Sequence, residues 1–157
     1  MNDFNPFTDL SSDKFERMWQ VNVLGLFWCM QEQIRLMAPQ KLGHIVNMSS
    51  AAGLHGTPGG ATYAATKHAV VGLTRSAAAE YAQAGLYITS IAPGVIKTDI
   101  LDGMIKDGPM TEESLSEMMP VKKIGDPAEI ARAVSFLLGS EFTTGSVLEV
   151  DGGVGAT

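Results

Sequence analysis

The 157-residue chain is long enough to bury one hydrophobic core, and its 45% apolar and 18% charged residues are ordinary for a globular domain. A formal net charge of -6, without any run of Lys or Arg, argues against nucleic acid and anionic membrane surfaces as partners. The chain has neither the roughly 18 consecutive apolar residues of a membrane span nor the start of a signal peptide, so we expect one cytoplasmic domain over residues 1–157.

The first predicted element is a helix over residues 12–38, because apolar side chains recur there at the spacing of one helical face. Ser11 or Ser12 would cap its first turn, and Pro39 would end it. The single cysteine, Cys29, lies within this pattern and has no cysteine to pair with, so we expect a small buried side chain in a reducing compartment.

Asn22 is unusual in this helix because its polar amide lies on the apolar face. A buried amide needs hydrogen-bond partners. We expect Asn22 either to brace a distortion of the helix or to hold a water molecule.

Two strands and a second helix follow in alternation. Residues 44–49 are predicted to form a β-strand that leads into a Gly/Pro-rich loop at 53–60. An alanine-rich helix is expected over 61–84 and a buried strand over 86–91, which Pro93-Gly94 ends.

The last third of the chain begins with an irregular stretch. Residues 97–121 are expected to form a mobile excursion with one or two short helices, and they hold four methionines, Met104, Met110, Met118 and Met119. Asp126-Pro127-Ala128-Glu129 has the pattern of a capped helix start, and 147–150 is a short strand. The alternation predicts an α/β fold with a parallel sheet covered by helices.

Tyr63 and Lys67 are four residues apart on the predicted helix, so their side chains lie on one face, one turn apart. A nearby cation favours the phenolate, and Lys67 is therefore expected to lower the pKa of Tyr63 toward the neutral range, where a tyrosine works as an acid or base. Taken alone, the spacing also fits an exposed lysine beside a half-buried tyrosine.

Ser50 follows the 44–49 strand, at the end of a parallel sheet where side chains face the ligand crevice. Its hydroxyl would be placed to hold a substrate carbonyl. Two alternatives stay open, namely that Ser50 only caps a turn, and that the neighbouring Ser49 takes the functional role.

Five segments together resemble successive motifs of the short-chain dehydrogenases/reductases, in family order and at family spacing. The resemblance covers essentially the whole chain, and five ordered motifs are far more specific than one. The segments are residues 19–23, 45–50, 63–67, 93–98 and 144–153.

The resemblance implies an NAD- or NADP-dependent oxidoreductase that interconverts a small-molecule ketone and a secondary alcohol. Tyr63 would be the general acid/base, and Lys67 would lower its pKa and bind the nicotinamide ribose. Ser50 would polarise the substrate carbonyl, and Asn22 would anchor a water in a proton relay that ends at Lys67. The positions that would border the nicotinamide are Pro93, Gly94, Ile96 and Thr98.

Other features follow from the same resemblance. The 97–121 stretch would be a substrate lid, and its methionines hint at an apolar substrate. The helices around Asn22 and Tyr63 would pack against their copies in a homodimer or homotetramer. The residues that distinguish NAD from NADP would lie outside the matching motifs.

The chain departs from the family in lacking its glycine-rich, pyrophosphate-binding start. Neither glycine cluster, at 53–60 or 152–155, has the G-x-G-x-x-G spacing followed by a helix. We therefore expect an incomplete Rossmann-like, doubly wound parallel sheet of about three strands, with 44–49 as an unpaired edge.

Two functional hypotheses remain. In the first, the chain is an oxidoreductase whose other half comes from another polypeptide, an upstream segment or assembly. In the second, it is a truncated, non-catalytic fragment that acts only in oligomerisation or interaction. A cofactor-independent relative such as a halohydrin lyase is disfavoured because Lys67 is present.

Overall fold

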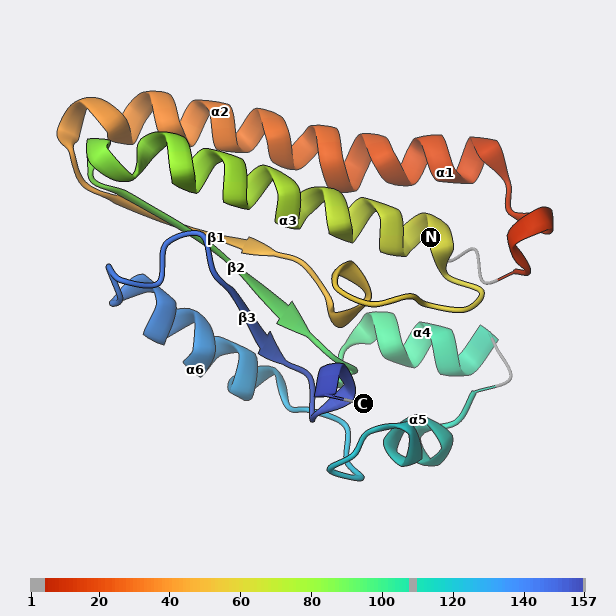
Figure 1. Ribbon diagram of the computed structural model, residues 1–157. Helices are drawn as coiled ribbons and strands as arrows, with labels where there is room; N and C mark the ends of the chain where they lie inside the picture. Colours follow the sequence, from red (N-terminus) through yellow and green to blue (C-terminus); the bar gives the residue numbers. More distant parts are fainter. Residues whose placement is uncertain (1–4, 108–109, 157) are drawn as a thin grey trace.

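The computed structural model describes residues 5–107 and 110–156, and its centre is a parallel sheet of three strands. The strands β1 (Gly43–Met48), β2 (Leu86–Pro93) and β3 (Val147–Val150) lie in the order β1-β2-β3. Helices α2 (Gly25–Met37) and α3 (Ala61–Tyr81) cover one face of this sheet, and α6 (Pro127–Leu138) covers the other (Figure 1). The predicted α/β fold with about three parallel strands is confirmed, and within the described residues β1 is an edge strand.

The N-terminal helical region is less regular than the sequence pattern predicts. Helix α1 (Ser12–Trp19) begins after Ser11, whose hydroxyl accepts a hydrogen bond from the Lys14 amide at 3.3 Å. A π-helical turn (Gln20–Leu24) then separates α1 from α2 (Gly25–Met37). The helix predicted over 12–38 is therefore present, but the π-helical turn, which contains Asn22, interrupts its α-helical geometry.

The main core lies between the sheet and the pair α2 and α3 (Ala61–Tyr81). Burial of each leucine, isoleucine or methionine side chain in this core contributes about 1.5–3 kcal/mol, and this burial fixes the two helices on the sheet. The buried cluster consists of Met30, Ile45, Ala78, Leu86 and Ile88.

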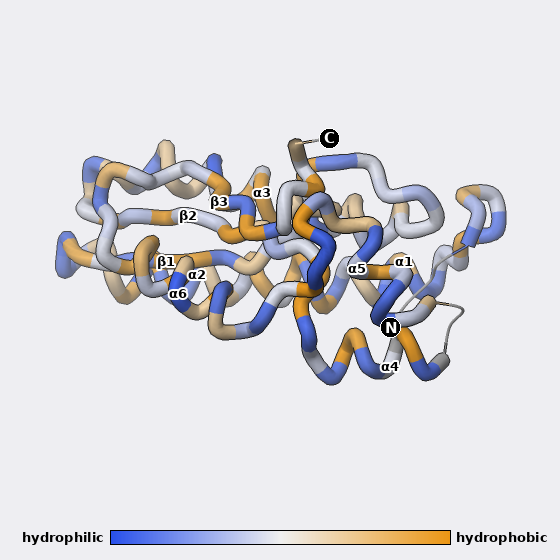
Figure 2. The backbone as a smooth tube through the Cα atoms, turned by 90° about the horizontal axis from the view of Figure 1, so that it is seen from below, coloured by the Kyte–Doolittle hydropathy of each residue, from blue (hydrophilic) through white to orange (hydrophobic). Residues whose placement is uncertain are grey.

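Two short helices, α4 (Asp99–Asp107) and α5 (Glu112–Met118), form the excursion between β2 and α6 (Pro127–Leu138). Apolar and polar residues alternate along α4 (Figure 2), and Leu101 is buried while Ile100 is exposed. Of the four methionines, Met119 is buried and Met110 and Met118 are exposed, while the side chain of Met104 lies outside the described part. The two short helices confirm the predicted secondary structure, and the predicted mobility stays a prediction.

Two further observations concern the surface. Cys29 is exposed, contrary to the prediction of a buried side chain, because it lies about 100° around α2 from the core residue Met30. None of the helices in residues 5–107 and 110–156 is long and apolar enough to cross a membrane.

Candidate active site

A cavity of about 710 Å³ lies at the carboxyl ends of β1 and β2. This is the end of a parallel sheet where ligand sites form. Its wall is built from the π-helical turn, the end of β1, the first turns of α3, the end of β2, and residues of α4, α5 and α6. All eight residues predicted from the sequence line it, namely Asn22, Ser50, Tyr63, Lys67, Pro93, Gly94, Ile96 and Thr98.

Tyr63 and Lys67 lie on one face of α3, as their spacing predicts. The Lys67 Nζ atom lies 5.6 Å from the centre of the Tyr63 ring and donates a hydrogen bond to the Met48 carbonyl oxygen at 3.0 Å. Burial lowers the pKa of Lys67. The amine is therefore fixed at the junction of α3 and β1.

The two adjacent serines have different environments. Ser49 is buried, and its hydroxyl donates to the Lys67 backbone carbonyl at 3.0 Å, so it joins β1 to α3. Ser50 lines the same cavity as Tyr63 and lowers the pKa of its phenol, and the Ser50 hydroxyl accepts a hydrogen bond from the Ala52 amide at 3.3 Å. Ser50 therefore caps a turn and also lines the cavity beside Tyr63, and its functional role, rather than that of Ser49, stays a prediction.

The pKa of Tyr63 is raised above its ordinary value. Burial is the larger cause because it disfavours the charged phenolate, and the hydrogen bond from Ser50 acts in the opposite direction. The expected lowering by Lys67 was wrong for this structure, since the ammonium is bonded to the Met48 carbonyl rather than to the phenol oxygen. At neutral pH the phenol is therefore protonated and available as a proton donor.

Asn22 connects the distorted helix to α3. Its Nδ2 donates to the Thr66 hydroxyl at 3.1 Å, and that hydroxyl donates to the Tyr63 backbone carbonyl at 2.8 Å. Of the two alternatives for Asn22, the distortion is present as the π-helical turn, while the water remains a prediction. Thr66 is the link that the sequence analysis missed, although it lies directly before Lys67.

The end of β2 supplies the opposite wall. Gly94 donates a backbone hydrogen bond to Val150 at 3.1 Å, and a Cβ at Gly94 would come within 2.7 Å of the Asp151 carbonyl oxygen. Only glycine allows this close approach. The Thr98 hydroxyl donates to the Ile96 carbonyl at 3.4 Å, which keeps both residues in one turn at the cavity.

The rest of the cavity is mostly apolar, and these residues were also missed. Leu101 and Leu115 come from α4 and α5 and are buried, so the excursion forms part of the wall. Their positions on the apolar faces of short helices were the available signal. The other apolar lining residues include Met18, Val21, Ile100 and Ile130.

The part of the chain that the structure describes contains no ready set of metal ligands. No group of three or more His, Cys, Asp or Glu side chains there is arranged to hold an ion. The polar groups of the cavity are instead hydroxyl, phenol, amide and ammonium groups, which bind and protonate oxygen atoms.

Comparison with known proteins finds dehydrogenases and reductases among those similar to this chain. A family model described as enoyl-(acyl carrier protein) reductase matches residues 1–155. The chain is 38% identical over 151 residues to a 2,5-dichloro-2,5-cyclohexadiene-1,4-diol dehydrogenase of Sphingobium indicum. This alignment covers 94% of this chain and 60% of that protein. It is 34% identical over 159 residues to a levodione reductase of Leifsonia aquatica, covering 97% of this chain and 60% of that protein.

A solved structure extends the similarity to three dimensions. The structure described as ElxO with NADP bound matches with a TM-score of 0.93 and 38% sequence identity, over 100% of this chain and 64% of that chain. The chain thus spans about 60% of the length of the curated relatives above.

Proposed function

Because the chain belongs to the short-chain dehydrogenase/reductase family, we propose that it takes part in the NAD(P)-dependent interconversion of a carbonyl compound and a secondary alcohol, with Tyr63 as general acid/base. The observation that carries the proposal is that Ser50, Tyr63 and Lys67 line one cavity, where the Ser50 hydroxyl lies close enough to Tyr63 to lower its pKa. These three groups supply a carbonyl-binding hydroxyl, a proton donor and a cation at one place.

The nicotinamide, when bound, supplies or accepts the hydride. In reduction, the Ser50 hydroxyl donates a hydrogen bond to the substrate carbonyl oxygen. Tyr63 then gives its proton to that oxygen as negative charge develops there. The raised pKa of Tyr63 favours this direction, because the phenol stays protonated at neutral pH.

The residues around Lys67 suit the ribose of a nicotinamide cofactor. An ammonium group has three N–H donors, and the Met48 carbonyl is the hydrogen-bond acceptor recorded for Lys67 within the described residues. The other donors can hold ribose hydroxyls. Pro93, Gly94, Ile96 and Thr98 would border the nicotinamide ring, and both NAD and NADP remain candidates.

Asn22 would anchor a water that relays protons to Lys67. Its amide nitrogen is held by Thr66, which supports a fixed position at the cavity wall. This arrangement would resupply the proton that Tyr63 gives up.

The excursion over 97–121 would act as the substrate lid of this single partial domain. Leu101 and Leu115 give it an apolar inner side, so the substrate would be a small alcohol or ketone with an apolar body. A lid of this kind excludes water from the reacting carbonyl.

The chain would form a homodimer or homotetramer. Large apolar side chains are exposed on α2, at Trp28 and Leu36, and on α6, at Phe136. Exposed apolar groups of this size favour association. Sedimentation velocity would measure the mass of the assembly, and a monomer at all concentrations would reject this part of the proposal. The cytoplasmic location stays a prediction from the sequence.

The first experiment is calorimetric titration of NADH and NADPH, separately, into the purified chain. We expect saturable binding of at least one, and we expect Tyr63→Phe to keep binding while turnover falls by about 10²–10⁴-fold. Tyr81→Phe is the matched control, since Tyr81 ends the same helix but does not line the cavity. A folded chain that binds neither cofactor would instead support the non-catalytic fragment.

A further inference from the structure

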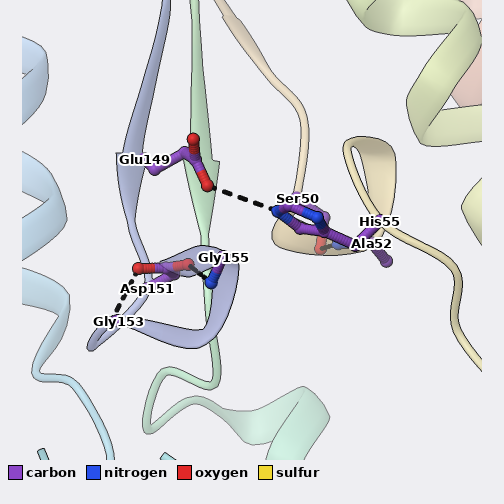
Figure 3. Close-up of polar contacts among 7 residues, drawn as sticks. All are labelled: Ser50, Ala52, His55, Glu149, Asp151, Gly153 and Gly155. Atoms are coloured by element: carbon purple, nitrogen blue, oxygen red, sulfur yellow. Dashed lines mark hydrogen bonds and ion pairs between the residues drawn. The ribbon is translucent and has the colours of Figure 1, made fainter. Parts of the chain in front are cut away.

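The C-terminal turn, residues 151–156, is closed by one carboxylate. Asp151 accepts hydrogen bonds from the backbone amides of Gly153 at 2.9 Å and Gly155 at 2.6 Å (Figure 3). This turn lies directly after β3 and next to the cavity wall, because Gly94 bonds to Val150. The C-terminal turn therefore has a defined shape at the end of the sheet.

A second polar contact joins this region to the loop that carries Ser50. The Nε2 atom of His55 lies 3.5 Å from the Glu149 carboxylate, although the two residues are 94 positions apart (Figure 3). Glu149 is the one charged residue of the four-residue strand β3. A Cβ at Gly155 would collide with this carboxylate and approach His55, so the glycine leaves the space in which the pair meets.

His55 and Ser50 belong to the same hydrogen-bonded turn. The Gly53 amide donates to the Ser50 carbonyl at 2.8 Å, and the His55 amide donates to the Ala51 carbonyl at 3.2 Å. The Ser50 hydroxyl also caps this turn through Ala52. A displacement of His55 would therefore be transmitted to Ser50 through these three hydrogen bonds of the turn.

We propose that Glu149 and His55 are positioning residues, whose contact ties the Ser50–His55 turn to β3 and keeps the Ser50 hydroxyl on the Tyr63 phenol. Neither side chain lines the cavity, so both act through Ser50. The inference rests on the proposed roles of Ser50 and Tyr63, but its test does not require turnover.

The pKa of Tyr63 reports whether Ser50 is in place. The Ser50 hydrogen bond opposes the rise caused by burial, so losing it should raise this pKa further. Among the described residues that line the cavity, Lys67 is the one that carries a charge, and Asp151 is the other carboxylate beside the His55–Glu149 pair. Removing the Glu149 charge alone would lower the Tyr63 pKa, so an upward shift separates positioning from a direct charge effect.

The experiment is a pH titration by NMR of the full chain labelled with ¹³C at the tyrosine Cζ. The signal of Tyr63 is assigned among the three tyrosines with Tyr63→Phe. A neutral imidazole keeps one N–H donor, so the contact with Glu149 persists at the alkaline pH of the titration. The variants are Ser50→Ala, His55→Ala, Glu149→Ala and the conservative Glu149→Gln, with Glu112→Ala as a surface control.

We expect Glu149→Ala and His55→Ala each to raise the Tyr63 pKa in the same direction as Ser50→Ala. Glu149→Gln should leave the Tyr63 pKa close to its original value. The double variant His55→Ala/Glu149→Ala should raise this pKa no further than either single variant, since the two residues act as a unit. For Glu149→Ala and His55→Ala, we expect kcat to fall by up to about 100-fold, with little change in the KM for the cofactor.

An unchanged Tyr63 pKa in Glu149→Ala and His55→Ala, beside a raised one in Ser50→Ala, would overturn the positioning role and leave the proposed function standing. An unchanged value in Ser50→Ala would reject the Ser50–Tyr63 contact itself, and with it the basis of both proposals.

Discussion

Helix α3 and the excursion over 97–121 form two sides of one cavity, but they are held in different ways. In α3, Thr66, Val70 and Thr74 are fully or almost fully buried, and Thr74 receives a hydrogen bond from Asn47 of β1 at 2.9 Å. In the excursion, burial is confined to Leu101, Leu115 and Met119 among the described residues.

This difference in burial indicates that α3 is the more rigid side of the cavity and the excursion the less rigid side. The groups that would move protons lie on the element that cannot shift without disrupting the core. The groups that would contact the body of a substrate lie on short helices whose rearrangement exposes little apolar surface. The four predictions below test this contrast through the free energy of unfolding.

The largest effect is expected on the α3 side, where Ile88 of β2 packs beneath the helix and is 0% exposed. Ile88→Ala should lower the free energy of unfolding by about 2–5 kcal/mol, because it leaves a cavity in the core. Ile100→Ala is the matched control on α4, where the side chain is 74% exposed, and should change it by less than about 0.5 kcal/mol. If the two variants lost equal stability in urea denaturation, the contrast between the α3 side and the excursion would be wrong.

The next effect concerns the link between the π-helical turn and α3. Thr66→Val should cost about 1–3 kcal/mol, because the Asn22 amide loses its acceptor. Thr62→Val is the control on the same helix, since the buried Thr62 hydroxyl has no hydrogen-bond partner among the described residues, and it should be neutral or stabilising. If both variants lose the same stability in urea denaturation, the Asn22–Thr66 bond does not brace the helix.

A smaller effect is expected where the excursion ends. Asp126 caps α6 with bonds to Ala128 and Glu129, so Asp126→Ala should cost about 1 kcal/mol in global unfolding. Thr111 caps the seven-residue helix α5 in the same way, but Thr111→Ala should mainly speed local amide hydrogen exchange in α5. If Thr111→Ala lowered the global free energy of unfolding as much as Asp126→Ala does, α5 would unfold together with the core.

The smallest effect is expected for a surface ion pair of the excursion. Lys97 and Glu112 are 3.3 Å apart and both are well exposed, so Lys97→Met should change the free energy of unfolding by less than about 1 kcal/mol. Added salt should remove the remaining difference between the variant and the original chain. A larger loss that persists in high salt would show that this pair fixes the excursion more firmly than its exposure indicates.

Much of this molecule could be predicted from local patterns. The strand over 44–49, the capped start of α6 and the Tyr63–Lys67 spacing are properties of neighbouring residues, and each is present in the structure. The alternation of these elements was enough to predict the parallel sheet, because such connections leave few arrangements.

The sequence by itself therefore determined the order of the elements and the eight residues named above that line the cavity. The tertiary structure decided the rest. Asn22 of the π-helical turn meets Thr66 of α3, the rise in the Tyr63 pKa depends on burial, and His55 meets Glu149 only across the folded chain. These features arise from contacts between distant segments and from exclusion of water, and a local pattern of residue types contains neither.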